Sequence, residues 1–154
     1  MQKLRAYINA PVSIAPLTSF RMLFGGVMFV SVLRFMLRGW VTELYVAPKF
    51  YFSYFGFEWV KPLGEIGMYA VFAVMALSCL GILLGALYRV SRISFFLTWT
   101  YVELLDVTNY LNHYYFVSIV AFLLIWVPAA KDFSLDAKWW PKTRAEIVPR
   151  WTIG

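Results

Sequence analysis

The residues best suited to chemistry lie close together, between positions 103 and 115. Asn109–Tyr115 reads NYLNHYY and contains the only histidine of the 154-residue chain, His113. Glu103 and Asp106 are three residues apart, so a helix would place both carboxylates on one face. If that helix continued, His113 would follow Asp106 on the same face. A carboxylate beside an imidazole orients the ring, and such a polar cluster can bind a phenol or quinone oxygen and move a proton.

The same residues also have a structural interpretation, and spacing does not decide between the two. Asn112 is well placed to cap a following helix, with its side chain accepting a backbone N–H. Tyr110, Tyr114 and Tyr115 would then be anchors at a membrane interface, where tyrosine is enriched. The two carboxylates either face the interior, as ionisable groups within a membrane span usually do, or reach the lipid headgroups.

Other kinds of site do not fit these residues. One histidine and one cysteine cannot assemble a typical zinc site, so we expect no metal. The carboxylates lack the sugar-binding loops of a glycosidase, and no glycine loop is present to bind phosphate. The net charge is +6, but no cationic run is interleaved with stacking aromatics, so we expect no nucleic-acid partner. Cys79 lies in an apolar run and is expected to be a small packed residue.

The elements that must position these residues are predicted to be membrane-spanning helices. The chain is 62% hydrophobic and 14% charged, against roughly 45–50% and about 25% in soluble domains. Because lipid-exposed backbone must satisfy its own hydrogen bonds, this composition predicts an all-α, polytopic transmembrane helix bundle. Four stretches are apolar enough to span, at about 17–37, 66–87, 90–107 and 114–130. Arg21 and Arg34, near the ends of the first span, are expected to snorkel towards the headgroups.

The loop charges predict the orientation of these spans. Basic residues exceed acidic ones in the N-terminal segment, between the second and third spans, and in the C-terminal tail. The positive-inside rule makes these three regions cytoplasmic, so both termini lie inside. NYLNHYY and the loop between the first two spans then face the extracytoplasmic side. The chain is thus predicted to be an integral membrane protein whose candidate site faces outward.

Two further segments have a recognisable pattern. Residues 50–60, FYFSYFGFEWV, hold seven aromatic residues in 11. This segment is either an aromatic belt at the outer interface or a lid over a flat apolar ligand. Gly81 and Gly85 form a G-x-x-x-G pattern, which favours close helix packing within the second span.

Five motifs in a fixed order resemble a known family. They are FRMLFGG, FYFSYFGFEWV, GALYRVS, LLDVTNYLNHYY and FSLDA, at residues 20–26, 50–60, 85–91, 104–115 and 133–137. Together they resemble the N-terminal part of the HTTM domain, the membrane domain of vitamin K-dependent gamma-carboxylase and its bacterial relatives. The resemblance covers nearly the whole chain. It implies that residues 1–154 are the N-terminal part of a single such domain in a bacterial inner membrane.

The resemblance also implies an activity. The family's carboxylase, a lyase, oxidises vitamin K hydroquinone with O2, and the oxygenated quinone removes a γ-proton from a peptide glutamate. The carbanion adds CO2, and the quinone leaves as an epoxide. No metal is needed. The family's histidine and the preceding asparagine match His113 and Asn112, whose implied role is to bind and polarise the quinol, next to Tyr114. Asp106 and Asn109 would support the turn. The implied partners are membrane lipid, the quinone and a glutamate-containing protein substrate.

The chain departs from the carboxylase pattern at several places. Val107 stands where the carboxylase often has lysine, and Leu111 replaces a second asparagine. The family's catalytic lysine lies in a later Gly-Gly-x-x-Lys segment, which this sequence lacks. We therefore expect a fragment or truncated product that is inactive by itself. The alternatives are a non-catalytic membrane module that binds lipid or a partner protein, and a small transporter, which the lack of a symmetric repeat disfavours.

Overall fold

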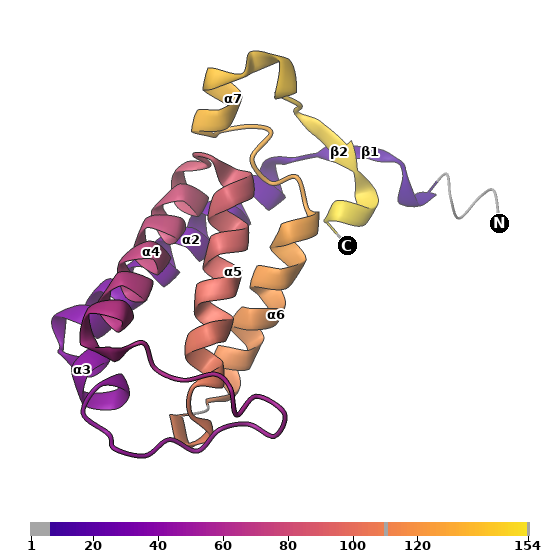
Figure 1. The fold of residues 1–154 in the computed structure, drawn as a ribbon. Coiled ribbons are helices and arrows are strands. Elements are labelled where there is room, and N and C mark those ends of the chain that lie inside the picture. The colour runs from indigo at the N-terminus through magenta and orange to yellow at the C-terminus, as the bar shows by residue number, and fades with distance from the viewer. Residues whose placement is uncertain (1–6, 110, 154) are drawn as a thin grey trace.

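The computed structural model describes residues 7–109 and 111–153, which are mostly helical (Figure 1). The long helices are α2 (Ala15–Leu37), α4 (Gly64–Leu84), α5 (Tyr88–Leu104) and α6 (Asn112–Trp126). Two short α-helices, three 3-10 helices and two short strands complete the described elements: α3 (Trp40–Tyr45), α7 (Leu135–Trp139), η1 (Val107–Asn109), η2 (Pro141–Thr143), η3 (Arg150–Thr152), β1 (Pro11–Ser13) and β2 (Ile147–Pro149).

Each of the four predicted spans coincides with one long helix. Among the described helices, α2 and α4 are long and apolar enough to cross a membrane. α5 and α6 have 17 and 15 residues, or about 25 and 22 Å of helix, against about 30 Å of bilayer core. The membrane crossing of α5 and α6, and the inside-outside orientation, therefore remain predictions.

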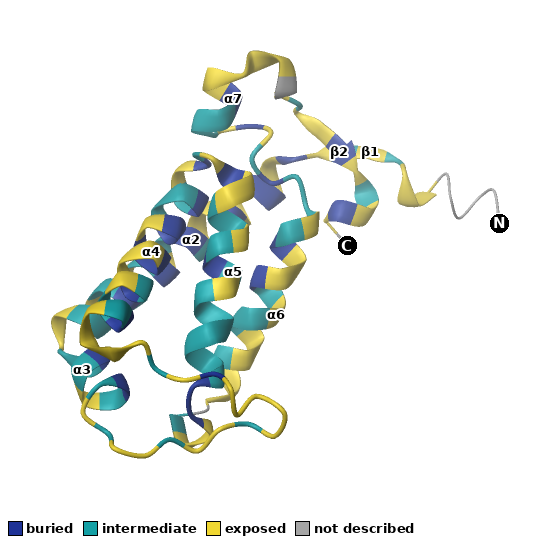
Figure 2. Cartoon of the chain, viewed as in Figure 1, coloured by how far each residue is buried: buried dark blue, intermediate teal, exposed yellow. Residues whose placement is uncertain are grey.

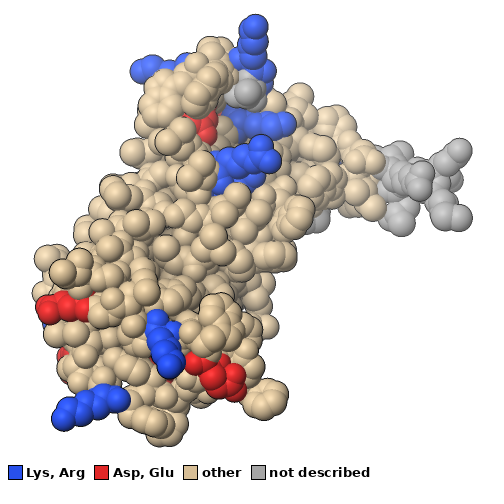
Figure 3. All heavy atoms as spheres, viewed as in Figure 1, with Lys and Arg blue, Asp and Glu red and all other residues tan. Residues whose placement is uncertain are grey.

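The outer faces of the helices are apolar. Only 22% of the apolar window of α2 and 39% of that of α4 is buried within the protein. Large side chains such as Leu23, Val30 and Leu77 are more than 60% exposed, and Figure 2 shows exposed positions along the outer sides of the long helices. In Figure 3, the charged side chains gather at the two ends of the visible face and leave its middle uncharged. These surfaces are consistent with membrane association.

The long helices pack as sequential neighbours, α2 on α4, α4 on α5 and α5 on α6 (Figure 1). Gly25 lets α2 approach α4 closely, because a Cβ there would lie 2.6 Å from the backbone nitrogen of Leu83. Met75 and Phe95 are fully buried in the core between these helices. Cys79 is also fully buried, which confirms the prediction of a packed residue.

The two glycines of the G-x-x-x-G pattern have different roles. At Gly81 an added Cβ would collide with the side chain of Ser91, so this glycine allows close contact between α4 and α5. Gly85 has a φ of 63° and ends α4 in the left-handed conformation. The second predicted span therefore ends at Leu84, three residues earlier than expected.

A small strand pair was not predicted by the all-helical interpretation. β1 pairs with β2 in antiparallel register, with Val12 opposite Val148. Each strand has only three residues, which is too short for a recognisable apolar alternation in the sequence. The pairing holds the two terminal segments together, next to the ends of α2 and α6 (Figure 1).

Candidate functional site

A cavity of about 300 Å³ lies near the end of the molecule where α5 leads into α6. We call this the His113 end. Apolar and aromatic side chains from α2, α3, α4, α5 and α6 form most of its wall: Val27, Met28, Val32, Phe35, Trp40, Phe72, Met75, Trp99, Val102 and Val117. Polar groups line the rest: Ser31, Arg34, Tyr45, Glu103, Asp106, Asn109, His113 and Tyr114. Four of the five residues proposed from the sequence as site or supporting residues therefore lie on one cavity; Asn112 does not.

Asp106 is held in a tight turn rather than on a helix. α5 ends at Leu104, three residues before the predicted end of the third span, so the helix does not continue through Asn109. The Oδ1 atom of Asp106 accepts hydrogen bonds from the backbone N–H of Thr108 at 2.9 Å and from its hydroxyl at 2.8 Å. This local bonding competes with helix continuation and starts the short helix η1. Asp106 is 7% exposed, and the turn carries Asn109 to the cavity wall.

The start of α6 places His113 at the cavity. The helix begins at Asn112, and the preceding Leu111 occupies the cap position without a side-chain hydrogen bond. The capping role considered for Asn112 is therefore wrong. Asn112 is exposed and is absent from the cavity wall, whereas His113 contributes to it. The imidazole packs edge-on against Tyr114, with ring centroids 4.6 Å apart. Tyr110, one of the three tyrosines considered as interface anchors, lies outside the described residues.

Glu103 faces inward, towards α6. Its Oε2 atom accepts a hydrogen bond from the hydroxyl of Ser118, and its side chain lines the cavity. Of the two alternatives for the carboxylates, the interior placement is the one observed for both. Nearby, Trp99 donates from Nε1 to the backbone oxygen of Tyr114 at 3.3 Å, and the two rings pack edge to face. These contacts join α5 to α6 along the cavity wall.

The opposite wall includes residues that the sequence interpretation missed. Arg34 was expected to snorkel, yet it lines the cavity from α2, and Trp40 and Tyr45 line it from α3. Burial raises the pKa of the Tyr45 phenol above its ordinary value of 10, with Tyr114 and Asp106 adding to the shift. The phenol therefore stays protonated at neutral pH. The charge-based orientation placed Arg34 on the same side as His113, and this signal could have identified it.

The aromatic segment 50–60 lies beside the cavity without lining it. The backbone N–H of Val107 donates to the carbonyl of Phe52 at 2.9 Å, and the Tyr51 hydroxyl donates to the carbonyl of Tyr45 at 2.9 Å. Several of its rings point outward, with Phe55 98% and Trp59 76% exposed. None of its residues belongs to the cavity wall described above. This arrangement fits the aromatic-belt interpretation.

At the opposite end of the helices, polar groups bind one another. We call this the Arg21 end. Arg21 is fully buried, so the expectation that it snorkels is wrong. Its guanidinium donates to the carbonyls of Ile82, Leu83 and Phe133 at 2.6, 2.9 and 2.7 Å. The first two carbonyls belong to the C-terminal turn of α4, where a cation is favourable.

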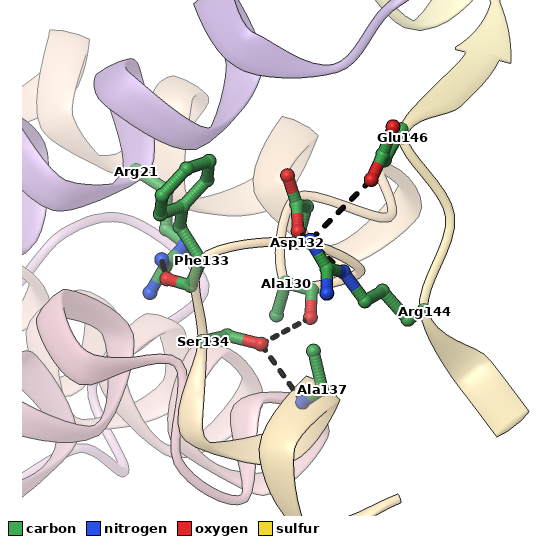
Figure 4. Close-up of polar contacts among 8 residues, drawn as sticks. All are labelled: Arg21, Ala130, Asp132, Phe133, Ser134, Ala137, Arg144 and Glu146. Atoms are coloured by element: carbon green, nitrogen blue, oxygen red, sulfur yellow. Dashed lines mark hydrogen bonds and ion pairs between the residues drawn. The ribbon is translucent and has the colours of Figure 1, made fainter. Parts of the chain in front are cut away.

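The segment after α6 completes the Arg21 end (Figure 4). Ser134 donates to the carbonyl of Ala130 and accepts from the N–H of Ala137, which starts α7. Asp136 accepts from the N–H groups of Leu87 and Tyr88, both at 2.8 Å, and so fixes the start of α5. The motifs at 20–26, 85–91 and 133–137 thus meet at this end. The motifs at 50–60 and 104–115 meet at the His113 end.

Comparison with known proteins identifies the family. No solved structure gives a significant match to this chain. The HTTM domain family matches residues 9–154, which include both ends of the helices and the whole cavity wall. The match agrees with the resemblance found in the motifs. The chain belongs to the HTTM domain family.

Proposed function

We propose that this chain is a membrane-embedded, vitamin K-dependent gamma-carboxylase-like protein that binds a quinol in the cavity at the His113 end. One observation carries the proposal. In a chain of the HTTM domain family, His113, Asn109, Asp106 and Glu103 line the same aromatic-walled cavity. HTTM domains are associated with vitamin K-dependent carboxylase-like proteins.

The cavity suits a flat, amphipathic ring system. Its volume is at the lower end of the range of about 300–1,000 Å³ that small-molecule sites occupy. Phe35, Phe72 and Trp99 supply aromatic surface for such a ring. The histidine, amide and carboxylate groups supply the few directed polar contacts that fix orientation in such sites. A quinol has this combination of a flat apolar ring and two hydroxyl groups.

Each residue then has a role that follows from its position. His113 would hydrogen-bond one quinol oxygen and polarise it, with Tyr114 restricting the imidazole ring. Asp106 would hold the turn through Thr108, and Asn109 would present its amide from that turn. When bound, the quinol would supply, with O2, the base that removes a γ-proton from a glutamate so that CO2 can be added.

The proposed setting is a bacterial inner membrane, with the cavity near the extracytoplasmic surface. Two apolar helices with outward-facing apolar sides support membrane association. The exposed rings of segment 50–60 would lie at the outer interface, where a quinone could leave the lipid. The proposed partners are lipid, the quinone and a glutamate-containing protein.

A non-catalytic membrane-binding module is the second candidate. The composition of the cavity wall favours it. The described residues of the wall include one cationic side chain, Arg34, and no lysine, which is the residue type of the family's catalytic group. Such a module would bind a lipid or a partner protein without turnover. Quinone binding distinguishes the two candidates, because a module of this kind has no need of the His113 contact.

The test is quinol binding by the full chain in lipid nanodiscs. We expect a reduced, short-chain 1,4-naphthoquinone to bind saturably, followed by quenching of tryptophan fluorescence. His113→Ala should weaken this binding about tenfold, the value of one hydrogen bond of about 1.4 kcal/mol. Tyr115→Ala is the matched control, because Tyr115 is 56% exposed and lies outside the cavity wall. Absence of saturable binding, or equal binding by the His113 variant, would reject the proposed site.

A further inference from the structure

Glu103 is an unusual residue for its position. It is the only acidic residue of α5, and it lies next to the C-terminal end of that helix. A carboxylate there meets the partial negative charge of the helix end, which is an unfavourable placement. It also lies in a predicted span, where ionisable groups are costly and usually functional.

The direction of the side chain excludes a simple headgroup contact. Cα–Cβ bonds tilt towards the N-terminus of a helix, so Glu103 points back along α5, away from the end at which the chain leaves the helix. Its Oε2 atom accepts from Ser118, which lies well inside α6. The carboxylate is thus held between α5 and α6, on the cavity wall. Among the described residues, none donates a hydrogen bond to the other oxygen, Oε1.

The need to hold α5 against α6 does not explain why residue 103 carries a carboxylate. Arg92 already donates to the carbonyls of Leu124 and Val127 at 3.1 and 3.0 Å, and Trp99 donates to α6 at Tyr114. A neutral amide or hydroxyl would accept the Ser118 hydrogen bond equally well, without the cost of a charge near a helix C-terminus. What a carboxylate adds is the ability to take up a proton.

We propose that Glu103 is the proton acceptor for a hydroxyl group of the bound quinol. This inference rests on the proposed function of the cavity. The O–H bond of the quinol breaks, the proton moves to Oε1 of Glu103, and the electron pair stays on the quinol oxygen. Ser118 holds Oε2 and so fixes the orientation of the acceptor. His113, from the start of α6, would hold the ligand at the mouth of the same cavity.

Several charged or titratable groups share the cavity with Glu103 and bear on its proton. They are Arg34 on α2, Tyr45 on α3, Asp106 after α5, and His113 and Tyr114 on α6. Arg34 is the cation among them. Asp106 is the competing proton acceptor, with its Oδ1 engaged by both donors of Thr108, and the Asp106→Asn variant separates the two carboxylates.

The experiment uses infrared difference spectra of the full chain in nanodiscs, without oxygen. Binding of a reduced 1,4-naphthoquinone should produce the carbonyl band of a protonated carboxylic acid, and binding of the oxidised form should not. Glu103→Gln should abolish the band, while Asp106→Asn should retain it. Because glutamine keeps the shape and accepts from Ser118, the variant should bind the oxidised form within about twofold of wild type.

The affinities give a second readout. Glu103→Gln should bind the reduced naphthoquinone about 10- to 100-fold more weakly, as expected for the loss of a hydrogen bond to a charged group. Ser118→Ala should keep the band and shift its frequency. A band that persists in Glu103→Gln, or no band in a wild-type chain that binds both forms, would overturn the role of Glu103. A wild-type chain that binds neither form would overturn the proposed function itself.

Discussion

The two ends of the helices use similar residues in opposite ways. At the Arg21 end, the guanidinium donates to three carbonyls, and both oxygens of Asp136 accept backbone N–H groups. At the His113 end, Arg34, Glu103 and His113 face a cavity of about 300 Å³. Polar groups that satisfy one another stabilise the fold. Polar groups directed at a cavity are available to a ligand.

This difference separates the motifs by role. The three motifs at the Arg21 end connect the start of α2, the α4–α5 turn and the segment after α6. Each contact joins residues far apart in sequence, which fixes the helices relative to one another. At the His113 end, the motif at 104–115 instead forms a break between α5 and α6. That break is what carries His113 and Asn109 to the cavity wall. The first end therefore provides the rigidity that the second needs.

The largest effect is expected when the hydrogen bonds at the Arg21 end are removed. Arg21→Met keeps about the same volume but removes the donors to three backbone carbonyls. The free energy of unfolding should fall by about 3 kcal/mol, because three carbonyls lose charge-assisted hydrogen bonds from a buried guanidinium. Thermal unfolding in a mild detergent would measure the change.

Arg89→Met is the control for that experiment. Arg89 lies close to the same end of the molecule, but it is exposed, so its substitution should change stability by no more than about 0.5 kcal/mol. If the two variants unfold at the same temperature, the buried arginine is not the stabilising element inferred from its hydrogen bonds.

The sequence predicted the helices better than it predicted their ends. Apolar runs located all four long helices, because length and hydropathy are local properties. The end of α5 was missed because Asp106 bonds locally to Thr108, a competition that hydropathy does not register. The burial of Arg21 was missed because its acceptors lie 61 to 112 positions away. Residue type and spacing singled out His113 and Asp106 as candidates, but only the family resemblance favoured a binding site over a structural role.

The second prediction concerns the pH dependence of stability at the His113 end. Burial raises the pKa of Tyr45 above 10, whereas the unfolded chain has the ordinary value. Folded Tyr45 therefore keeps its proton above pH 10 while the unfolded form loses it. Stability should fall as pH rises beyond 10, by about 1.4 kcal/mol per pH unit from this residue. Unfolding of wild type and Tyr45→Phe between pH 9 and about 11 should show a shallower slope for the variant; equal slopes would contradict the assignment.

The smallest effect is expected at Asp106. Two substitutions there distinguish its hydrogen bonds within the turn from its negative charge. Asp106→Asn keeps an oxygen that can accept from Thr108, so the unfolding free energy should change by less than about 0.5 kcal/mol. Asp106→Ala removes the acceptor and should cost about 1–2 kcal/mol, because the Thr108 donors lose their partner. Thermal unfolding in detergent measures both. A loss with asparagine as large as that with alanine would mean that the negative charge matters. Asp106 would then act through its charge, as Arg21 does at the other end, rather than through the turn observed here.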